Sequence, residues 1–255
     1  MISERQKDIL WAVIEEHTKL AEPVSSKSLS EKQGFDIGAP MIRKEMNQLE
    51  KEGFLASPHT SAGRIPTDKA YRLYIQENMS NPASSRQRSG LRGASRSTGL
   101  SQKEEEKVSV SLKKNWPDEQ SLLKEISKLT SELSKELSVA GTVGGENNYT
   151  FGFSNLIDEP EFSSFANINQ LMNLMDNMDK YFDLLWNKFL EEDLQVFIGK
   201  ENPIKEINEF TLITGKYQLP EGESGFISII GPKRMNYKRN MALIEYIASY
   251  LNKQL

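Results

Sequence analysis

Residues suited to catalysis are scarce in this sequence, whereas residues suited to binding gather in its first 65 positions. The 255-residue chain has no cysteine and two histidines, His17 and His59. A structural zinc site with the usual ligands is therefore not expected. It also has no phosphate-binding loop of the Gly-rich Lys-Ser/Thr type and no Gly-x-Ser-x-Gly nucleophile elbow. We expect no metal, no cofactor and no enzymatic activity.

A helix is predicted from Pro40 to Glu52, and its two faces differ in chemistry. With Ile42 at the centre of the inner face, Met46 and Leu49 lie beside it, at roughly 100° per residue. Amide and cationic groups on the opposite face could hydrogen-bond to base edges and phosphates. That face and its flanks carry Met41, Arg43, Lys44, Asn47, Gln48 and Lys51. The same pattern also fits an ordinary solvated helix face, and the helix alone leaves both interpretations open.

Residues 58–66, which follow this helix, are predicted to form a loop between two short extended pieces, the shape of a wing. The loop carries His59, Thr60, Ser61 and Arg64. Hydroxyls, backbone amides and Arg suit phosphate contacts, and Arg can enter a narrow minor groove. His59 on its own is better explained as a turn histidine bonded to local backbone.

The elements around the helix indicate how it is positioned. A first helix capped by Ser3 presents Ile9, Leu10, Val13 and Ile14 on one face. A short second helix runs from Ser25 or Ser26 to Gln33, where Gly34 ends it. This helix, the turn and the helix from Pro40 make a helix-turn-helix arrangement. A fourth helix follows Thr67, so residues 1–79 are predicted to be a winged helix-turn-helix domain.

The rest of the chain divides into a basic linker, residues 80–117, and a small α+β domain, residues 118–255. From Ser84 to Lys103 the sequence has five cationic residues and no acidic one, among Ser and Gly, which predicts a flexible linker. Its charge could touch phosphate or simply be solvated. Apolar spacing predicts helices at 118–137, 162–192 and 236–253, and strands at 139–143, 149–153, 194–198, 210–214 and 225–230.

Charge is distributed unevenly along the chain. Met1 to Lys114 has 19 Lys and Arg against 15 Asp and Glu, a net +4, and the remainder has 13 against 21, a net −8. The basic first part agrees with a nucleic-acid partner, although such asymmetry also arises by chance. No apolar run is long enough to span a bilayer, and no signal-peptide core is evident, so a cytoplasmic protein without membrane contact is expected.

Residues 1–76 resemble the winged-helix domain of the HrcA family, the heat-inducible repressors of bacterial chaperone operons. The most specific match is the uninterrupted block from Pro58 to Lys69, followed by Tyr71-Arg72. Shorter matches lie further along the chain. They are Pro160-Glu161-Phe162, Ile198-Gly199, Glu201-Asn202 and the segment from Gly231 to Tyr237. The resemblance implies a reduced GAF-like second domain and a homodimer on an inverted-repeat operator of double-stranded DNA. It also adds Ser26 and Lys27 to the expected DNA contacts.

The resemblance further implies release from the operator on heat stress and a GroE-type chaperonin that helps keep the repressor active. Met41 and Lys44 stand where the family commonly has Thr and Asn, and Pro40 stands where a small residue is usual. The chain is also shorter than its family, and most of the inserted dimerisation segment is missing. A dimer interface is therefore expected on the predicted long helix, whose apolar stripe could instead be core: Met175, Met178, Phe182, Leu185 and Phe189. Two alternative functions stay open, a small-molecule-responsive regulator and a winged helix used for protein binding.

Overall fold

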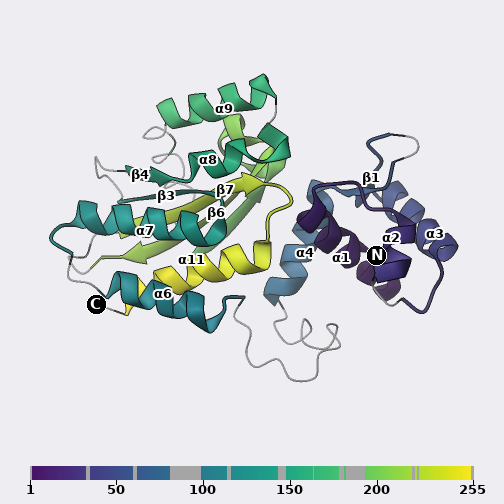
Figure 1. Cartoon of the computed structure of the whole chain (residues 1–255), viewed down its shortest axis with the longest axis horizontal. Helices are drawn as coiled ribbons and strands as arrows, with labels where there is room; N and C mark the ends of the chain where they lie inside the picture. The colour runs from purple at the N-terminus through teal and green to yellow at the C-terminus, as the bar shows by residue number, and fades with distance from the viewer. Residues whose placement is uncertain are drawn as a thin grey trace. The chain divides into compact units, whose positions relative to one another are not determined.

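The computed structural model separates into two compact units, Met1–Arg92 and Gly93–Leu255. Both combine helices with antiparallel strands, which confirms the predicted α+β class. Figure 1 shows the helices and strands of each unit. The structure describes residues 2–32, 35–59, 62–80, 99–113, 116–142, 148–162, 164–177, 181, 193–219, 222 and 224–253.

The first unit begins with three helices, as predicted. Helix α1 (Glu4–Leu20) starts at a capping box, in which the Ser3 side chain and the Gln6 side chain each bond the other's backbone N–H. Helix α2 (Ser26–Lys32) is short, and α3 (Ala39–Lys51) follows with Pro40 in its first turn, where a missing N–H costs no hydrogen bond. The apolar residues predicted for the inner faces of α1 and α3 are all buried: Ile9, Leu10, Val13, Ile14, Ile42, Met46 and Leu49.

Two short strands and a fourth helix complete this unit. Strand β1 (Leu55–Ala56) pairs antiparallel with β2 (Ile65–Pro66), and α4 (Asp68–Ser80) follows. An isolated antiparallel bridge adds Val24, whose N–H and C=O bond to the C=O and N–H of Arg64 at 2.9 and 2.8 Å. The chain passes so close here that a Cβ on Gly63 would lie 2.4 Å from the Val24 carbonyl oxygen. A glycine is therefore required where the loop meets the segment before α2.

The second unit is built on a five-stranded antiparallel sheet of order β4-β3-β7-β6-β5. All five strands fall within a few residues of their predicted positions. The long central pair, β6 and β7, is in register from Phe210↔Pro232 to Gln218↔Ser224. The bounds are β3 Leu137–Thr142, β4 Asn148–Phe151, β5 Leu194–Ile198, β6 Phe210–Gln218 and β7 Ser224–Pro232.

Helices cover both faces of this sheet (Figure 1). On one face lie α6 (Gln102–Leu112), α7 (Glu119–Ser134) and α11 (Tyr237–Asn252), and on the other lie α8 (Phe153–Ile157) and α9 (Phe165–Asp176). The core on the α8 and α9 side joins sheet residues such as Leu212 and Ile230 to Leu171 and Leu174 of α9. Helices on both faces account for the nearly continuous burial of β6 and β7 along their length.

Three predicted elements need correction. Part of the expected linker forms α6, because Ser101 and Glu104 make a capping box and Val108 and Leu112 bury one helix face. The helix predicted to reach residue 137 ends at Ser134, where the next residue is left-handed with φ 65°, and β3 begins two residues later. The helix predicted from 162 begins at Phe165, and residues 178–180 and 182–192 of that prediction lie outside the described residues. Among the helices described, none is long and apolar enough to cross a membrane.

Candidate nucleic-acid interface

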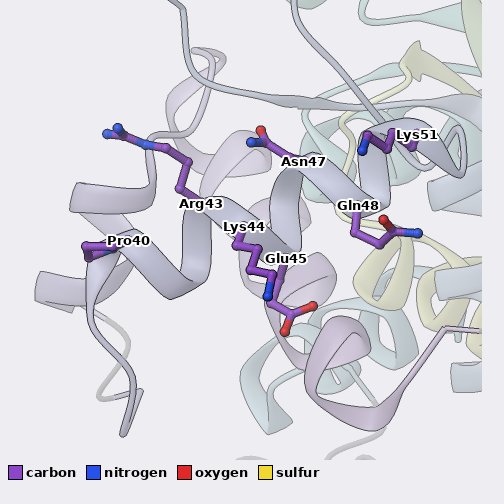
Figure 2. A pocket seen from close by; sticks show the side chains of 7 residues that line it. All are labelled: Pro40, Arg43, Lys44, Glu45, Asn47, Gln48 and Lys51. Carbon is purple, nitrogen blue, oxygen red and sulfur yellow. The ribbon is translucent and has the colours of Figure 1, made fainter.

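The outer face of α3 carries the polar side chains that the sequence assigned to DNA. Each of the six predicted residues on this helix is exposed, and five of them line a shallow groove of about 410 Å³ along the helix. Figure 2 shows the groove residues projecting from successive turns of α3. Pro40 and Glu45 complete the lining: Pro40, Arg43, Lys44, Glu45, Asn47, Gln48 and Lys51. Residues three and four apart share a face, so the cations and amides form one continuous strip.

An ion pair with the start of α1 holds the inner edge of this strip. The Glu45 carboxylate accepts a hydrogen bond of 3.0 Å from Gln6 Nε2 and lies 2.7 Å from the Arg5 guanidinium. The Glu45 side chain is only 11 % exposed. A carboxylate at this position would repel phosphate if it were unpaired, and its pairing with Arg5 offsets that charge.

Arg64 ties the β1–β2 loop to α3. Its Nε donates to Glu50 Oε2 at 2.9 Å, and one terminal nitrogen donates to Asn47 Oδ1 at 3.0 Å. The other terminal nitrogen donates to Ser57 Oγ at 3.3 Å and to the Ala62 carbonyl at 3.4 Å. The planar guanidinium therefore joins two α3 side chains to both ends of the loop.

The C-terminal end of α3 is fastened by the residues that open α4. Thr67 Oγ1 donates to the Gly53 carbonyl at 2.7 Å, and Lys69 Nζ donates to the Glu52 carbonyl at 2.8 Å. The same ammonium group lies 4.2 Å from the centre of the Phe54 ring, a cation–π contact. These bonds occupy the carbonyls of the two residues that follow α3, so Thr67 and Lys69 hold the end of α3 beside the start of α4.

The remaining predicted DNA contacts differ in their surroundings. Lys27 is exposed and lies 3.9 Å from Glu31 one helical turn away, whereas Ser26 is buried, with 6 % of its surface exposed. His59 is exposed, and its carbonyl accepts a hydrogen bond of 2.8 Å from Ser57. Thr60 and Ser61 lie outside the described residues. Three further residues of this site were not predicted from the sequence: Glu45, Glu50 and Lys69. The spacing of Glu45 three residues after Ile42 was the available signal that it faces α1.

A second group of charges, which the sequence did not predict, lies in the other unit. Arg234 donates to the Glu161 carboxylate at 2.6 and 3.0 Å and also pairs with Glu159. Glu136 is 7 % exposed, and within the described chain its Oε2 has no hydrogen-bond partner. Burial raises the pKa of Glu136 to about 9, Glu159 adds to the rise, and Arg234 opposes it. Two carboxylates thus bond the Arg234 guanidinium, and the raised pKa of the buried third, Glu136, favours its protonated form at neutral pH.

The predicted dimer stripe is described at one position only. Met175 is partly buried and packs against the core beneath α9, which matches the core interpretation for that residue. Met178, Phe182, Leu185 and Phe189 lie outside the described residues. On α9 the large apolar side chains that face outward are Phe165, 77 % exposed, and Met172, 51 % exposed.

Comparison with known proteins decides the family. The model of the HrcA protein C-terminal domain matches residues 91–241. This chain belongs to the HrcA family. A relative from Thermodesulfovibrio yellowstonii, named heat-inducible transcription repressor HrcA, is 27 % identical over 342 positions, covering 100 % of this chain and 98 % of the relative. A relative of the same name from Natranaerobius thermophilus is also 27 % identical, and the alignment covers 98 % of this chain and 96 % of the relative.

The alignment with the first relative also shows by how much this HrcA chain is shorter. The alignment spans 342 positions and this chain has 255 residues, so about 87 residues of the relative have no counterpart here. One solved crystal structure, described as that of a hypothetical protein, matches with a TM-score of 0.73 and 18 % identity over 99 % of this chain and 98 % of its own. That likeness shows a shared fold over the full length.

Proposed function

We propose that this HrcA-family chain is a heat-inducible transcription repressor that binds an inverted-repeat operator as a homodimer. In this proposal residues 1–79 are a winged helix-turn-helix domain, with α3 as the recognition helix and residues 58–66 as the wing. Residues 118–255 form a reduced GAF-like domain for regulation and dimerisation, and residues 80–117, of which α6 is a part, connect the two. The family and the names of its members support the repressor role.

The observation that carries the proposal is the chemistry of the exposed face of α3. Three cations, Arg43, Lys44 and Lys51, and two amides, Asn47 and Gln48, line one groove. The carboxylates of the same helix are held by internal partners: Glu45 by Arg5 and Glu50 by Arg64. The groove therefore offers donors and positive charge, the features that the major groove and the phosphates of DNA select.

Docking α3 in the major groove would place the two parts of this surface on different targets. The amides at the centre of the strip would reach base edges, whereas Arg43, Lys44 and Lys51 at its borders would reach phosphates. The β1–β2 loop, pinned beside α3 by Arg64, would lie on the flanking backbone. A two-fold dimer would present two such surfaces to successive major grooves, which explains why the operator should be an inverted repeat.

The decisive experiment measures fluorescence anisotropy of the full chain on the inverted repeat that precedes its host's chaperonin operon, with a scrambled duplex as control. We expect tight binding to the repeat alone, with an affinity that falls steeply as salt rises. Lys44→Ala should weaken binding and reduce the salt slope by about 1 for each protomer bound. Lys19→Ala is the matched control, because Lys19 is an exposed lysine of α1 that does not line the groove. Equal weak binding to both duplexes would refute the proposal and favour a protein-binding role.

Release on heating is the second part of the proposal, and it follows from low stability. A repressor that is only marginally stable loses its folded fraction as temperature rises, and operator occupancy falls with it. A GroE-type chaperonin would restore the folded fraction until other clients occupy it. Thermal melts that show a reversibly folding dimer, stable well above the growth temperature, would contradict this part and leave operator binding untouched.

A further inference from the structure

Arg64 has all its hydrogen-bond donors engaged inside the protein. A guanidinium has five N–H groups. The Nε–H bonds to Glu50, one terminal nitrogen bonds to Asn47 and also lies 2.9 Å from Glu50, and the other bonds to Ser57 and Ala62. The Arg64 side chain is only 20 % exposed. A side chain in this state has no donor left to offer a phosphate or a base.

The Arg64 bond also fixes which way the Asn47 amide points. A guanidinium can only donate, so the Asn47 atom that faces it must be the carbonyl oxygen, at 3.0 Å. The Asn47 NH₂ group is then the end of the amide that does not bond Arg64, and Asn47 is exposed and lines the groove. An asparagine that reads adenine uses both of its groups, the oxygen on N6 and the NH₂ on N7. Arg64 takes one lone pair of the Asn47 oxygen, so the NH₂ group is the part of Asn47 that we expect to meet a base, on an acceptor atom.

We infer that Arg64 and Glu50 are positioning residues rather than DNA contacts, and that they set Asn47 to recognise a base acceptor such as purine N7. This inference rests on the proposed function, since it assigns roles within the same DNA-binding surface. Arg64 pins the loop to α3 and orients Asn47, and Glu50 holds Arg64 in place. Specificity at one base pair of each half-site then depends on two residues that do not touch it.

Glu50→Gln tests the positioning role, because electrostatic repulsion and positioning of Arg64 predict changes of DNA affinity in opposite directions. Removing a negative charge beside the groove would tighten DNA binding if only electrostatics mattered. If Glu50 positions Arg64, Glu50→Gln should instead weaken specific binding by about tenfold, in line with the loss of one charged hydrogen-bonded partner. Glu15→Gln is the matched control: Glu15 is an exposed acid on α1 that does not line the groove, so this variant should leave affinity unchanged or slightly higher. Tighter binding by Glu50→Gln would overturn the inference.

The paired variant Glu50→Gln/Arg64→Gln keeps the net charge of the site and tests whether Arg64 meets phosphate. We expect weaker specific binding with an unchanged salt slope. A slope reduced by about 1 per protomer would show a phosphate contact by Arg64 and would overturn the inference. Thermal melts of each variant, with binding measured where the fold is intact, separate a lost contact from a lost fold. If the wild type itself does not prefer the inverted repeat, the proposed function fails; if it does and these variants behave otherwise, only the inference fails.

Modified duplexes test the role of Asn47. Purines of the operator are replaced one at a time by their 7-deaza analogues, which lack the N7 acceptor. At one position per half-site, the replacement should weaken wild-type binding by about tenfold and have no further effect on Asn47→Ala. In operators whose adenines lack the N6 amino group, the ratio of wild-type affinity to Asn47→Ala affinity should stay the same as on the unmodified operator. A ratio that changes on loss of N6 would show that Asn47 uses its oxygen on the base, which would overturn the donor assignment.

Discussion

Replacing Glu136 by glutamine should stabilise the second unit at pH 8 and change its stability little near pH 4. The ordinary pKa of a glutamate is 4.5, and burial raises that of Glu136 to about 9, with Glu159 adding to the rise. Between these two values the unfolded chain releases the Glu136 proton while the folded chain keeps it, so the free energy of unfolding falls as pH rises. Glutamine is nearly isosteric with the protonated acid and removes this dependence.

The magnitude follows from the separation of the two pKa values. Each pH unit above 4.5 contributes about 1.36 kcal/mol, which gives about 5 kcal/mol at pH 8 as an upper limit. Relaxation and water entry around the ionised group reduce this figure, so we expect a gain of about 2 kcal/mol or more. For a unit of this size, that corresponds to a rise of about 4–8 °C in Tm.

Thermal melts from pH 4 to pH 8 would measure this effect. Glu106→Gln is the matched control, because Glu106 is an exposed acid on α6 and a surface change of this kind is usually worth less than about 0.5 kcal/mol. An equal gain for Glu136→Gln at both ends of the pH range, or a gain no larger than that of Glu106→Gln at pH 8, would refute the reasoning. The expected result would identify a buried acid as one cause of low stability at neutral pH.

Three further predictions concern other parts of the chain. Gly63→Ala should destabilise the first unit by about 1–3 kcal/mol and weaken DNA binding, because its Cβ would lie 2.4 Å from a backbone oxygen; urea unfolding checks this. The pKa of Glu104 is lowered to about 2 by a backbone hydrogen bond at the helix cap and by Arg239. Glu104→Gln should therefore lower stability by about 1 kcal/mol at pH 7, with the difference vanishing as pH falls from 4.5 towards 2. The double variant Phe165→Ser/Met172→Ser should raise the dimer dissociation constant at least tenfold in analytical ultracentrifugation if α9 forms the interface, and an unchanged constant would move the interface elsewhere.

The fold was predictable where apolar spacing was strong and unpredictable where polar contacts decide the structure. The inner faces of α1 and α3 and all five strands of the large sheet follow from periodicity alone. Helix α6 was missed because it has only two buried apolar residues, Val108 and Leu112. Its other links are polar and join distant parts of the sequence: Arg239 bonds Glu104, and the Tyr250 hydroxyl donates to the Ser109 carbonyl at 3.1 Å. Sequence periodicity contains no signal for such contacts.

The candidate site shows the same division at the level of single residues. A 3.6-residue period was enough to find the exposed strip from Arg43 to Lys51, since exposure depends only on the side of the helix that carries a residue. It could not distinguish Lys44, which lines the groove, from Arg64, whose five donors are engaged by the protein itself. The difference depends on Glu50 and Asn47 lying within 3.0 Å of the Arg64 guanidinium across a gap of at least 14 residues. A basic residue beside a predicted DNA-binding helix can therefore be bonded entirely within the protein, and only the contacts of its nitrogen atoms distinguish it from an exposed cation.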